Sequence, residues 1–269
     1  MPFPAPAAVG AGRRREKFFA FIIPQPARLC YTAGMIRRDD LQYGGLVLFQ
    51  DDALPRFDAD AVHLAHFLRL RAGERVVDLG CGTGVLCVLG QAYTGAAFTG
   101  VDVEPRLTAL AALSAAQNGQ DIAFLTLDVR DAPARLGHGA FDAAVCNPPY
   151  FTAGPVSADP ARAAARHDAG GTFEAMLHAA FLLLKNGGRL FLCYPAAGLA
   201  AAMTALHAHR LEAKRLRLVA AGPDRPPRLA LIEAKKDGGA GLFVEPVLFE
   251  RELDRNSPKM RILPPKQRP

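Results

Sequence analysis

The chain has 269 residues, half of them apolar, and a formal net charge of +6. That length supports one sizeable α/β core but scarcely two, and no apolar run approaches the roughly 18 residues of a membrane-spanning helix. We therefore expect a single soluble domain without a membrane anchor, whose basic charge is compatible with a polyanionic partner but does not establish one.

The two ends of the chain lack the periodicity of helices and strands. Residues 1–34 are rich in Ala, Pro, Gly and Arg, and we expect them to form a disordered extension. Residues 253–269 are basic and rich in proline, so we expect a flexible tail. A single domain then spans residues 35–252, and Met35 is a candidate start of translation.

The middle of the chain alternates between helical and strand patterns. Apolar residues recur at helical spacing over residues 60–70, with Asp58 as the expected N-cap. Short apolar runs predict five strands, at residues 76–79, 97–101, 122–127, 143–146 and 189–194. This alternation predicts an α/β fold with a doubly wound, Rossmann-like sheet of parallel strands. Three further runs without intervening helices, at residues 211–220, 229–234 and 242–249, predict an antiparallel edge.

A glycine-rich segment lies between the first of these strands and the next helix. It reads Asp-Leu-Gly-Cys-Gly-Thr-Gly from Asp78 to Gly84, and glycines at such a turn let the backbone approach a ligand closely. Its spacing differs from the G-x-G-x-x-G of dinucleotide-binding loops, which disfavours a nicotinamide dehydrogenase. Asp78 suits the cationic amino group of a cofactor that carries an amino acid better than it suits a phosphate.

Two further carboxylates follow the next two strands. Asp102 lies about 20 residues beyond the glycines, where this architecture places an acceptor for two ribose hydroxyls, and Asp128 can accept from an adenine amino group. Each aspartate could instead cap the helix that follows it, but three such residues at neighbouring strand ends fit S-adenosylmethionine. The predicted cofactor-binding residues are Asp78, Gly80, Cys81, Gly82, Gly84, Asp102, Val103, Asp128, Val129 and Asn147.

The fourth strand is followed by Asn147-Pro148-Pro149-Tyr150, which indicates the chemistry of the acceptor. An exocyclic amine or an amide nitrogen is a poor nucleophile, and an asparagine carbonyl with a backbone carbonyl can orient it by accepting its two N–H bonds. The prolines fix φ and lack an amide donor, while the tyrosine ring offers a surface on which a base can stack. An ordinary Asn-Pro turn is the alternative. We predict catalytic roles for Asn147, Pro148 and Tyr150, and substrate binding by Pro149, Tyr150, Phe151 and Arg166.

Together with other short segments, these motifs resemble the tRNA1(Val) (adenine(37)-N6)-methyltransferases of the class I methyltransferase superfamily. The resemblance extends over residues 39–249 and includes Asp40-Leu41, Gly44-Gly45-Leu46, Arg56-Phe57 and Ala165-Arg166-His167. It implies a seven-stranded sheet, S-adenosylmethionine as the cofactor, and cytoplasmic methylation of the N6 of an adenine in a tRNA anticodon loop. Asp58-Ala59 departs from the Gly-Thr expected before Asp60, which leaves the particular tRNA open.

Two other functions remain open at this point. Glutamine N5-methyltransferases of release factors use the same tetrad on a side-chain amide, but they usually carry a sizeable helical domain ahead of the glycine loop. A non-catalytic RNA-binding protein on this scaffold would be expected to lose Asn147 or the glycines.

The remaining polar clusters give weaker signals. Five cysteines, far apart in the sequence, indicate buried reduced thiols in a cytoplasmic protein, which we expect to be a monomer. His63 and His66 lack a third ligand at suitable spacing, so we predict no metal site. Residues 210–236 hold eight Lys or Arg and three Asp or Glu, and together with the C-terminal tail they could form a phosphate-binding rim; a solvated strand face is the alternative.

Overall fold

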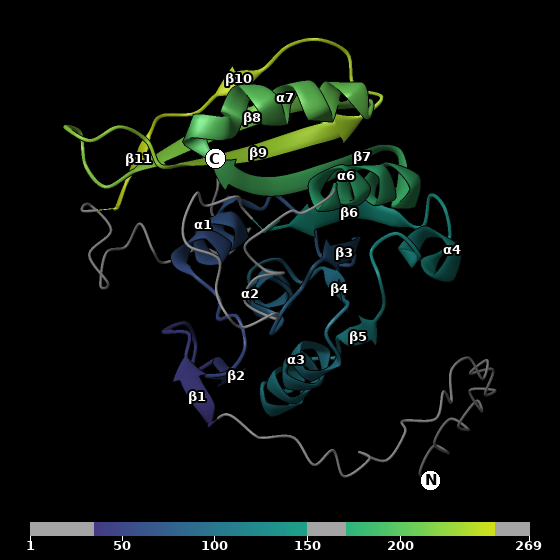
Figure 1. Ribbon diagram of the computed structural model, residues 1–269, viewed down its shortest axis with the longest axis vertical. Helices are drawn as coiled ribbons and strands as arrows, with labels where there is room; N and C mark the ends of the chain where they lie inside the picture. Colours follow the sequence, from purple (N-terminus) through teal and green to yellow (C-terminus); the bar gives the residue numbers. More distant parts are fainter. Residues whose placement is uncertain (1–34, 150–170, 251–269) are drawn as a thin grey trace, which may run out of the picture. The chain divides into compact units, whose positions relative to one another are not determined.

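The computed structural model describes residues 35–149 and 171–250 (Figure 1). The expected extension 1–34 and tail 253–269 lie outside these ranges, as do Tyr150, Phe151 and Arg166. The domain limits and the roles of these three side chains therefore stay predictions. Within the described residues, no helix is long and apolar enough to cross a membrane.

The core of the fold is a mixed sheet with β3 (Arg75–Leu79) near its middle. β3 pairs in parallel with β4 (Ala97–Asp102) on one side and with β6 (Phe141–Cys146) on the other. β5 (Ala123–Thr126) extends the sheet beyond β4, and β7 (Leu184–Pro195) extends it beyond β6, again in parallel. All five strands expected from the short apolar runs are present, which confirms the doubly wound part of the sheet.

The far side of the sheet is antiparallel, as expected. β9 (Leu229–Lys236) lies between β7 and β8 (Leu211–Ala220) and runs antiparallel to both. The seven longer strands therefore follow the order β5-β4-β3-β6-β7-β9-β8. A mostly parallel sheet with one reversed strand next to the last is the Rossmann-like arrangement that the sequence predicts.

The third strand predicted for this edge, at residues 242–249, is wrong in its extent. The structure forms only β10 (Phe243–Val244) and β11 (Leu248–Phe249), and both pair in parallel with β8. Between them, Pro246 has no amide donor for a strand ladder. The Glu245 side chain is buried and contacts three arginines. The ion pairs of Glu245 and the proline that follows it thus interrupt a segment whose apolar residues alone would predict a continuous strand.

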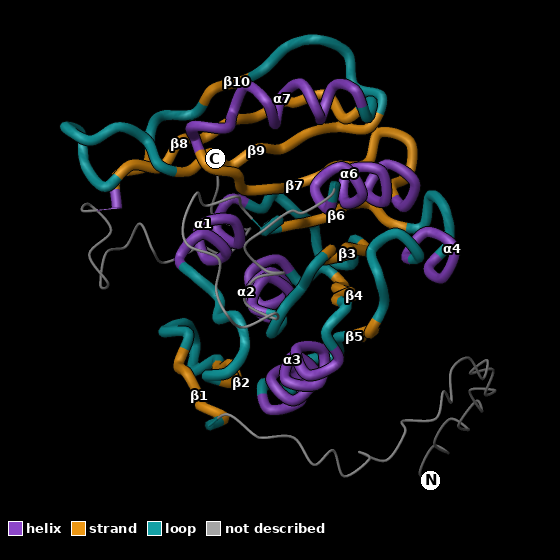
Figure 2. Tube along the Cα trace, in the orientation of Figure 1, coloured by secondary structure: helices purple, strands orange, loops and turns teal. Residues whose placement is uncertain are grey.

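Helices cover both faces of the sheet (Figures 1 and 2). The described helices are α1 (Ala59–Phe67), α2 (Val85–Thr94), α3 (Pro105–Gln117), α4 (Ala132–Leu136), α6 (Thr172–Leu183), α7 (Leu199–Ala208) and the 3-10 turn Ala196–Gly198. One apolar layer joins α1 and α2 to the sheet, and a second joins α6 and α7 to its other face. Successive strand residues alternate between the layers: at the end of β6, Val145 belongs to the α1 layer and Cys146 to the α6 layer.

A hairpin that the sequence analysis does not predict precedes the sheet. β1 (Ile36–Asp40) and β2 (Val47–Asp51) pair antiparallel. The hairpin is held to the residue that follows α3: the Val47 amide donates to Asn118 Oδ1 at 2.9 Å, and Asn118 Nδ2 donates to the Val47 carbonyl at 2.8 Å. The hairpin escapes prediction because β1 is largely exposed and charged, without the alternation of a half-buried strand.

The predicted cap of the first helix is confirmed. The Asp58 carboxylate accepts hydrogen bonds from the amides of Asp60 (3.0 Å) and Ala61 (3.3 Å), two donors that the first helical turn leaves unpaired. The helix is shorter than expected, because Leu68 has a ψ of 133° and ends it after Phe67. The cap fixes the start of α1, which lies close to the functional site described next.

Candidate functional site

The predicted polar residues follow neighbouring strands of the sheet. The strand order β6-β3-β4-β5 places Asn147 after β6, Asp78 and the glycine loop at the end of β3, Asp102 at the end of β4 and Asp128 two residues beyond β5. Because parallel strands end at the same edge of a sheet, the structure brings all four positions to one edge. Ligands of doubly wound sheets bind outside this edge.

The glycine loop adopts backbone conformations that only glycine adopts without strain. Gly80, Gly82 and Gly84 have φ values of 76°, 54° and 83°. A Cβ atom at Gly80 would meet the Met176 methyl group at 2.8 Å, and one at Gly84 would meet Ala111 Cβ at 2.9 Å. At Gly82, by contrast, nothing lies within 4 Å of the Cβ position. The loop is therefore packed against the protein at its two ends and open at its middle glycine.

Asp78 is a buried carboxyl next to this loop. Its side chain is fully buried, and burial raises its pKa to about 7. The Cys87 thiol donates to Oδ2 at 3.4 Å, whereas Oδ1 has no hydrogen-bond partner among the described residues. A buried acceptor without a donor is costly, so Asp78 is a point at which a cationic ligand group would be stabilising.

Asp102 connects the end of β4 to the glycine loop. Its Oδ2 accepts from the Gly82 amide at 2.8 Å and its Oδ1 from the Glu104 amide at 3.0 Å. Burial raises the pKa of this carboxyl, which remains partly accessible. The N-caps of the helices after β3, β4 and β5 are Gly84, Glu104 and Asp131. None of the three predicted aspartates is a helix cap, so the capping alternative does not account for them.

Asp128 has a partner that the sequence analysis does not identify. The Arg130 guanidinium donates to both carboxylate oxygens, at 2.9 and 2.8 Å, and the Arg130 amide also donates to Oδ1 at 2.9 Å. These hydrogen bonds hold the pKa of Asp128 below its usual range. The carboxylate is therefore charged at neutral pH, and a ligand would share it with Arg130. The Asp-x-Arg spacing is the local signal for this pair.

The three apolar neighbours predicted to bind the cofactor differ in their surroundings. Val103 is 68% exposed directly after Asp102, which is unusual for a large apolar side chain and leaves it available to a planar ligand. Val129 packs against the α6 layer, and Cys81 is buried in the α1 layer. Of the three side chains, only that of Val103 is exposed for direct contact with a ligand.

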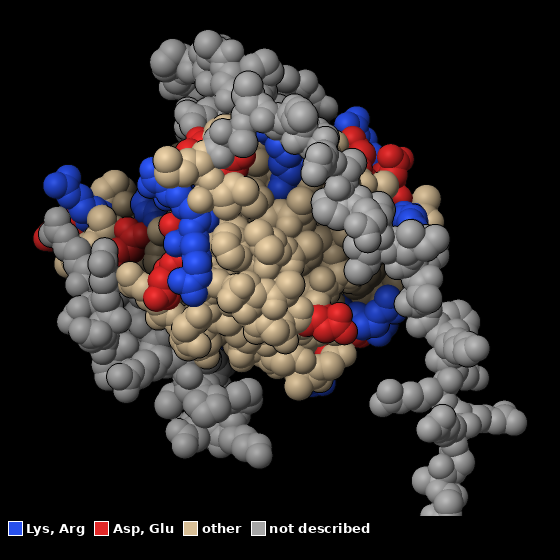
Figure 3. All heavy atoms as spheres, turned by 90° about the horizontal axis from the view of Figure 1, so that it is seen from below, with Lys and Arg blue, Asp and Glu red and all other residues tan. Residues whose placement is uncertain are grey.

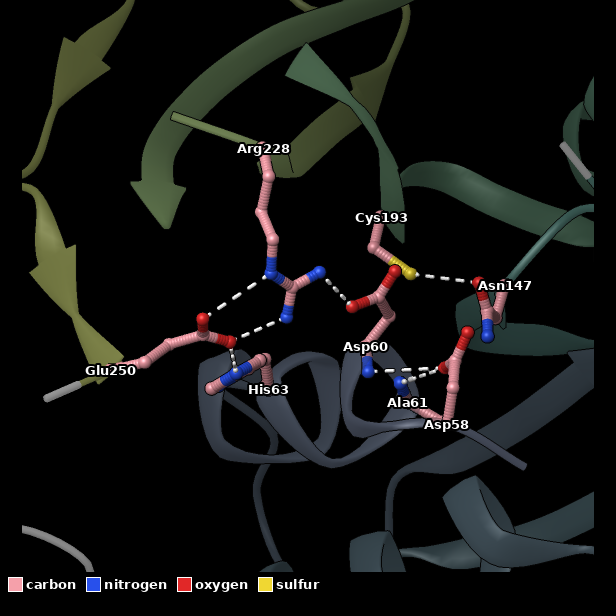
Figure 4. A network of polar contacts seen from close by, with 8 residues as sticks. All are labelled: Asp58, Asp60, Ala61, His63, Asn147, Cys193, Arg228 and Glu250. Atoms are coloured by element: carbon pink, nitrogen blue, oxygen red, sulfur yellow. Dashed lines mark hydrogen bonds and ion pairs between the residues drawn. The ribbon is translucent and has the colours of Figure 1, made fainter. Parts of the chain in front are cut away.

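Asn147 is half-buried at the start of the segment that follows β6. Its Oδ1 accepts a hydrogen bond from the Cys193 thiol at 3.0 Å (Figure 4). Pro148 is buried and Pro149 half-buried, so the backbone around the asparagine is held by packing as well as by the proline rings. The structure thus fixes both the backbone and the side chain of the residue predicted to meet the acceptor.

A second polar network lies beside Asn147 at the start of α1 (Figure 4). Arg228, just before β9, contacts Asp60 in the first turn of α1 and Glu250 near the end of the described chain. The His63 imidazole contacts the same Glu250 carboxylate at 2.9 Å. The network ties the start of α1 to the residues that flank the final strands, and sequence reasoning misses it because two of its contacting residues, His63 and Glu250, are 187 residues apart.

The histidines of α1 have packing and ion-pair roles. His66 stacks on the Tyr93 ring with centroids 5.0 Å apart, and burial lowers its pKa to about 4. His63 belongs to the network around Glu250. The four cysteines in the described ranges are buried and form no disulfide, as predicted. No group of three or more potential metal ligands occurs among the described residues.

Part of the basic stretch 210–236 stabilises the fold instead of lining a surface. Arg215 is buried among two glutamates, Lys236 donates to two backbone carbonyls and Arg228 belongs to the α1 network. These three side chains are therefore engaged within the fold, and the C-terminal tail that the predicted rim includes lies outside the described residues. The side of the molecule that carries β1, β2 and α3 shows a broad area without charged side chains (Figure 3), in keeping with the uncharged sequence of α3 after Arg106. A polyanion would find little attraction there.

Comparison with known proteins places this fold and site in a family. Residues 53–206 match the model of the methyltransferase small domain, which covers more than half of the chain. The chain belongs to this family. The methyltransferase is also similar to tRNA1(Val) (adenine(37)-N6)-methyltransferases: it is 30% identical to that of Edwardsiella ictaluri over 64% of this chain and 71% of the relative. With that of Shewanella amazonensis it shares 36% identity over 40% of this chain and 47% of the relative. The chain thus spans about half the length of the Shewanella protein.

Solved structures agree with this fold. A predicted O-methyltransferase of Agrobacterium tumefaciens superposes with a TM-score of 0.58 and 22% identity, over 71% of the methyltransferase and 86% of that chain. A Thermus thermophilus 16S rRNA N2 G1207 methyltransferase in complex with AdoMet and guanosine superposes with a TM-score of 0.56 and 19% identity, over 77% and 51%. At these identities the likeness establishes the fold alone.

The described residues fit S-adenosylmethionine, the cofactor of such methyltransferases. The open middle of the glycine loop leaves room for a ligand at Gly82. Each Asp102 oxygen receives one backbone hydrogen bond and can accept another from a ribose hydroxyl. Val103 offers an exposed apolar surface for a ring, and the Asp78 oxygen without a donor suits an ammonium group.

Proposed function

We propose that this methyltransferase transfers a methyl group from S-adenosylmethionine to the exocyclic N6 of an adenine in tRNA. The similar proteins are named for adenine 37 of a valine tRNA, and we extend that substrate to this chain as part of the proposal. The observation that carries it is the position of Asn147 at the end of β6, beside the glycine loop at the end of β3.

The residues at the ends of β3, β4 and β5 hold the cofactor in this proposal. S-adenosylmethionine supplies a methyl group bonded to a sulfonium sulfur. Asp102 accepts from the ribose hydroxyls, Val103 covers one face of the adenine, and Asp128 accepts from its amino group while paired with Arg130. Asp78 stabilises the cationic amino end, because its buried Oδ1 has no donor among the described residues.

Asn147 and the backbone that follows it orient the acceptor. The lone pair of an adenine N6 is delocalised into the ring, so the nitrogen must be held with that lone pair directed at the methyl carbon. The Asn147 carbonyl and a backbone carbonyl of the proline segment accept the two N–H bonds, and Tyr150 stacks on the base. The proton becomes acidic only as the N–C bond forms, so the mechanism requires no general base.

The decisive experiment is methylation of RNA by the full-length chain. The protein is incubated with labelled S-adenosylmethionine and bulk tRNA, the RNA is digested to nucleosides, and the label is sought in N6-methyladenosine. The Asn147→Ala variant under the same conditions is the matched control. Transcripts that differ only at position 37 then identify the nucleotide.

The same assay separates the alternative acceptors. Label found only in a release factor would assign the protein to glutamine N5 methylation, which uses the same hydrogen-bond geometry on an amide. A thermal shift produced by NAD and not by S-adenosylmethionine would contradict the cofactor assignment, since a ligand that binds only the folded state stabilises it.

A further inference from the structure

Asn147 and Cys193 face each other across two neighbouring strands. β6 and β7 pair in parallel with Val145 opposite Phe191 and Cys146 opposite Leu192. Continuing this register by one residue places Asn147 opposite Cys193. Because side chains alternate along a strand, both belong to the α1 side of the sheet, as Val145 and Phe191 do. The contact is therefore set by sheet register.

The contact fixes which end of the Asn147 amide faces the protein. Oδ1 lies 3.0 Å from the Cys193 sulfur, and Cys193 is fully buried. A thiol is a weak donor and a weak acceptor, and here it donates to the carbonyl oxygen. Rotating the amide by 180° would replace this bond with an N–H group directed at sulfur. A carbonyl oxygen accepts two hydrogen bonds, so the thiol and a substrate N–H can be bound by the same atom.

We propose that Cys193 is a positioning residue for methyl transfer, which holds the Asn147 carbonyl in the orientation that receives the acceptor amine. The inference rests on the proposed function. In this role the thiol acts through its hydrogen bond to Asn147. A serine at this position retains a donor, whereas an alanine removes it and leaves the amide less restrained.

Cys146 provides a matched control. It is as buried as Cys193, but its side chain belongs to the opposite layer of the sheet, next to α6. Cys146→Ala therefore removes an equivalent thiol and creates a similar cavity without removing the donor to Asn147. A role of Cys193 in packing alone would make the two alanine variants behave alike.

The kinetic experiment compares Cys193→Ala, Cys193→Ser and Cys146→Ala in the full-length chain with S-adenosylmethionine and tRNA. We expect Cys193→Ala to lower kcat about tenfold, the ratio that roughly 1.4 kcal/mol produces, with an unchanged KM for the cofactor. Cys193→Ser should recover most of the loss, and Cys146→Ala should keep the wild-type kcat. A wild-type kcat in Cys193→Ala, equal losses in the serine and alanine variants at position 193, or an equal loss in Cys146→Ala would each overturn the proposal.

A second readout does not depend on the reaction. In the ¹⁵N-labelled chain, the side-chain amide signals of Asn147 are assigned by their absence in Asn147→Asp. We expect them to shift in Cys193→Ala, to return toward the wild-type position in Cys193→Ser, and to stay in place in Cys146→Ala. Unshifted signals in Cys193→Ala overturn the inference even if tRNA is methylated. Shifted signals in a protein that methylates no tRNA support the positioning contact and reject the proposed function.

Discussion

The side chain of Asn147 is the residue whose removal most directly tests the acceptor site. It lies directly after β6, and its Oδ1 accepts from the Cys193 thiol on the neighbouring strand β7. We expect Asn147→Ala to bind S-adenosylmethionine with the wild-type thermal shift while losing roughly a hundredfold or more in turnover, as when a transition-state hydrogen bond is deleted elsewhere. Unchanged turnover would show that the reactive centre is elsewhere.

Asp78 makes the stability of the protein depend on pH. Burial raises its pKa from 3.8 to about 7, so between these values the folded state holds a proton that the unfolded state has released. The contribution of Asp78 to stability is then full below about pH 4 and is lost as the pH rises to about 7. Each pKa unit corresponds to about 1.4 kcal/mol, so the total change is a few kcal/mol.

The Asp78→Asn variant removes this titration. We expect its unfolding free energy, measured with denaturant from pH 5 to pH 8, to exceed that of the wild type by an amount that increases with pH. The Asp142→Asn variant is the control, because the half-buried Asp142 carboxylate accepts from Lys185 and the Arg75 amide, which hold its pKa below its usual range instead of raising it. Parallel curves for wild type and Asp78→Asn would contradict the raised pKa.

At the scale of single residues, the sequence predicts which residues form the candidate site better than it predicts their contacts. Asp78 and Asn147 are recognisable because each follows an apolar run and precedes glycines or prolines, and Asp102 because it ends the apolar run about 20 residues after the glycine loop. Their partners are set by sheet register and packing. Cys193 is 46 residues from Asn147, and nothing local distinguishes it from an ordinary core cysteine. The complete burial of Asp78 is likewise a property of the folded layers.

The helices and strands also differ in how well the sequence predicts them, and the cause is again whether local or tertiary contacts determine them. The parallel strands β3, β6 and β7 are predictable because strands buried on both faces are continuous apolar runs, and the more exposed β4 and β5 still contain short apolar runs. β1 is missed because its exposed residues carry charge, and residues 242–249 are overestimated because apolar content does not reveal the buried ion pairs of Glu245. A local sequence pattern therefore predicts a strand when apolar packing buries that strand. The pattern fails where other tertiary contacts hold the segment in place.

Substitution of Gly90 in α2 tests whether helix propensity or side-chain packing has the larger effect on stability. In an isolated helix, Gly90→Ala would be stabilising by about 1 kcal/mol. Here a Cβ would overlap the Phe98 ring of β4, and overpacking of this kind costs about 1–3 kcal/mol. We expect a lower melting temperature. Ala112→Gly, at an exposed position of α3, measures propensity alone and should lower stability by about 1 kcal/mol. If Gly90→Ala is instead more stable than the wild type, then β4 must shift to accommodate the added methyl group.

At the scale of the molecule, two carboxylates of the last described segment hold it to distant parts of the chain. Glu245 contacts Arg69, Arg215 and Arg217, and Glu250 contacts Arg228 and His63. Between them these contacts join α1 and the turn after it to the antiparallel side of the sheet. The positive charge of these basic side chains is thus used to hold the fold together.

The buried Arg215 should therefore contribute strongly to global stability. Its guanidinium contacts Glu233 at 2.7 Å and Glu245 at 3.1 Å, and all three side chains are largely buried. Removing one member of such a cluster leaves charges unpaired away from water, at a cost of about 3–5 kcal/mol. We expect Arg215→Met to lower the unfolding free energy by an amount near the lower figure, because Glu245 still contacts two other arginines.

The control variant is Arg210→Met, which breaks an exposed pair with Asp237. It should lower the unfolding free energy by less than about 1 kcal/mol. Equal losses in the two variants, measured by denaturant unfolding, would show that burial adds nothing to this pairing.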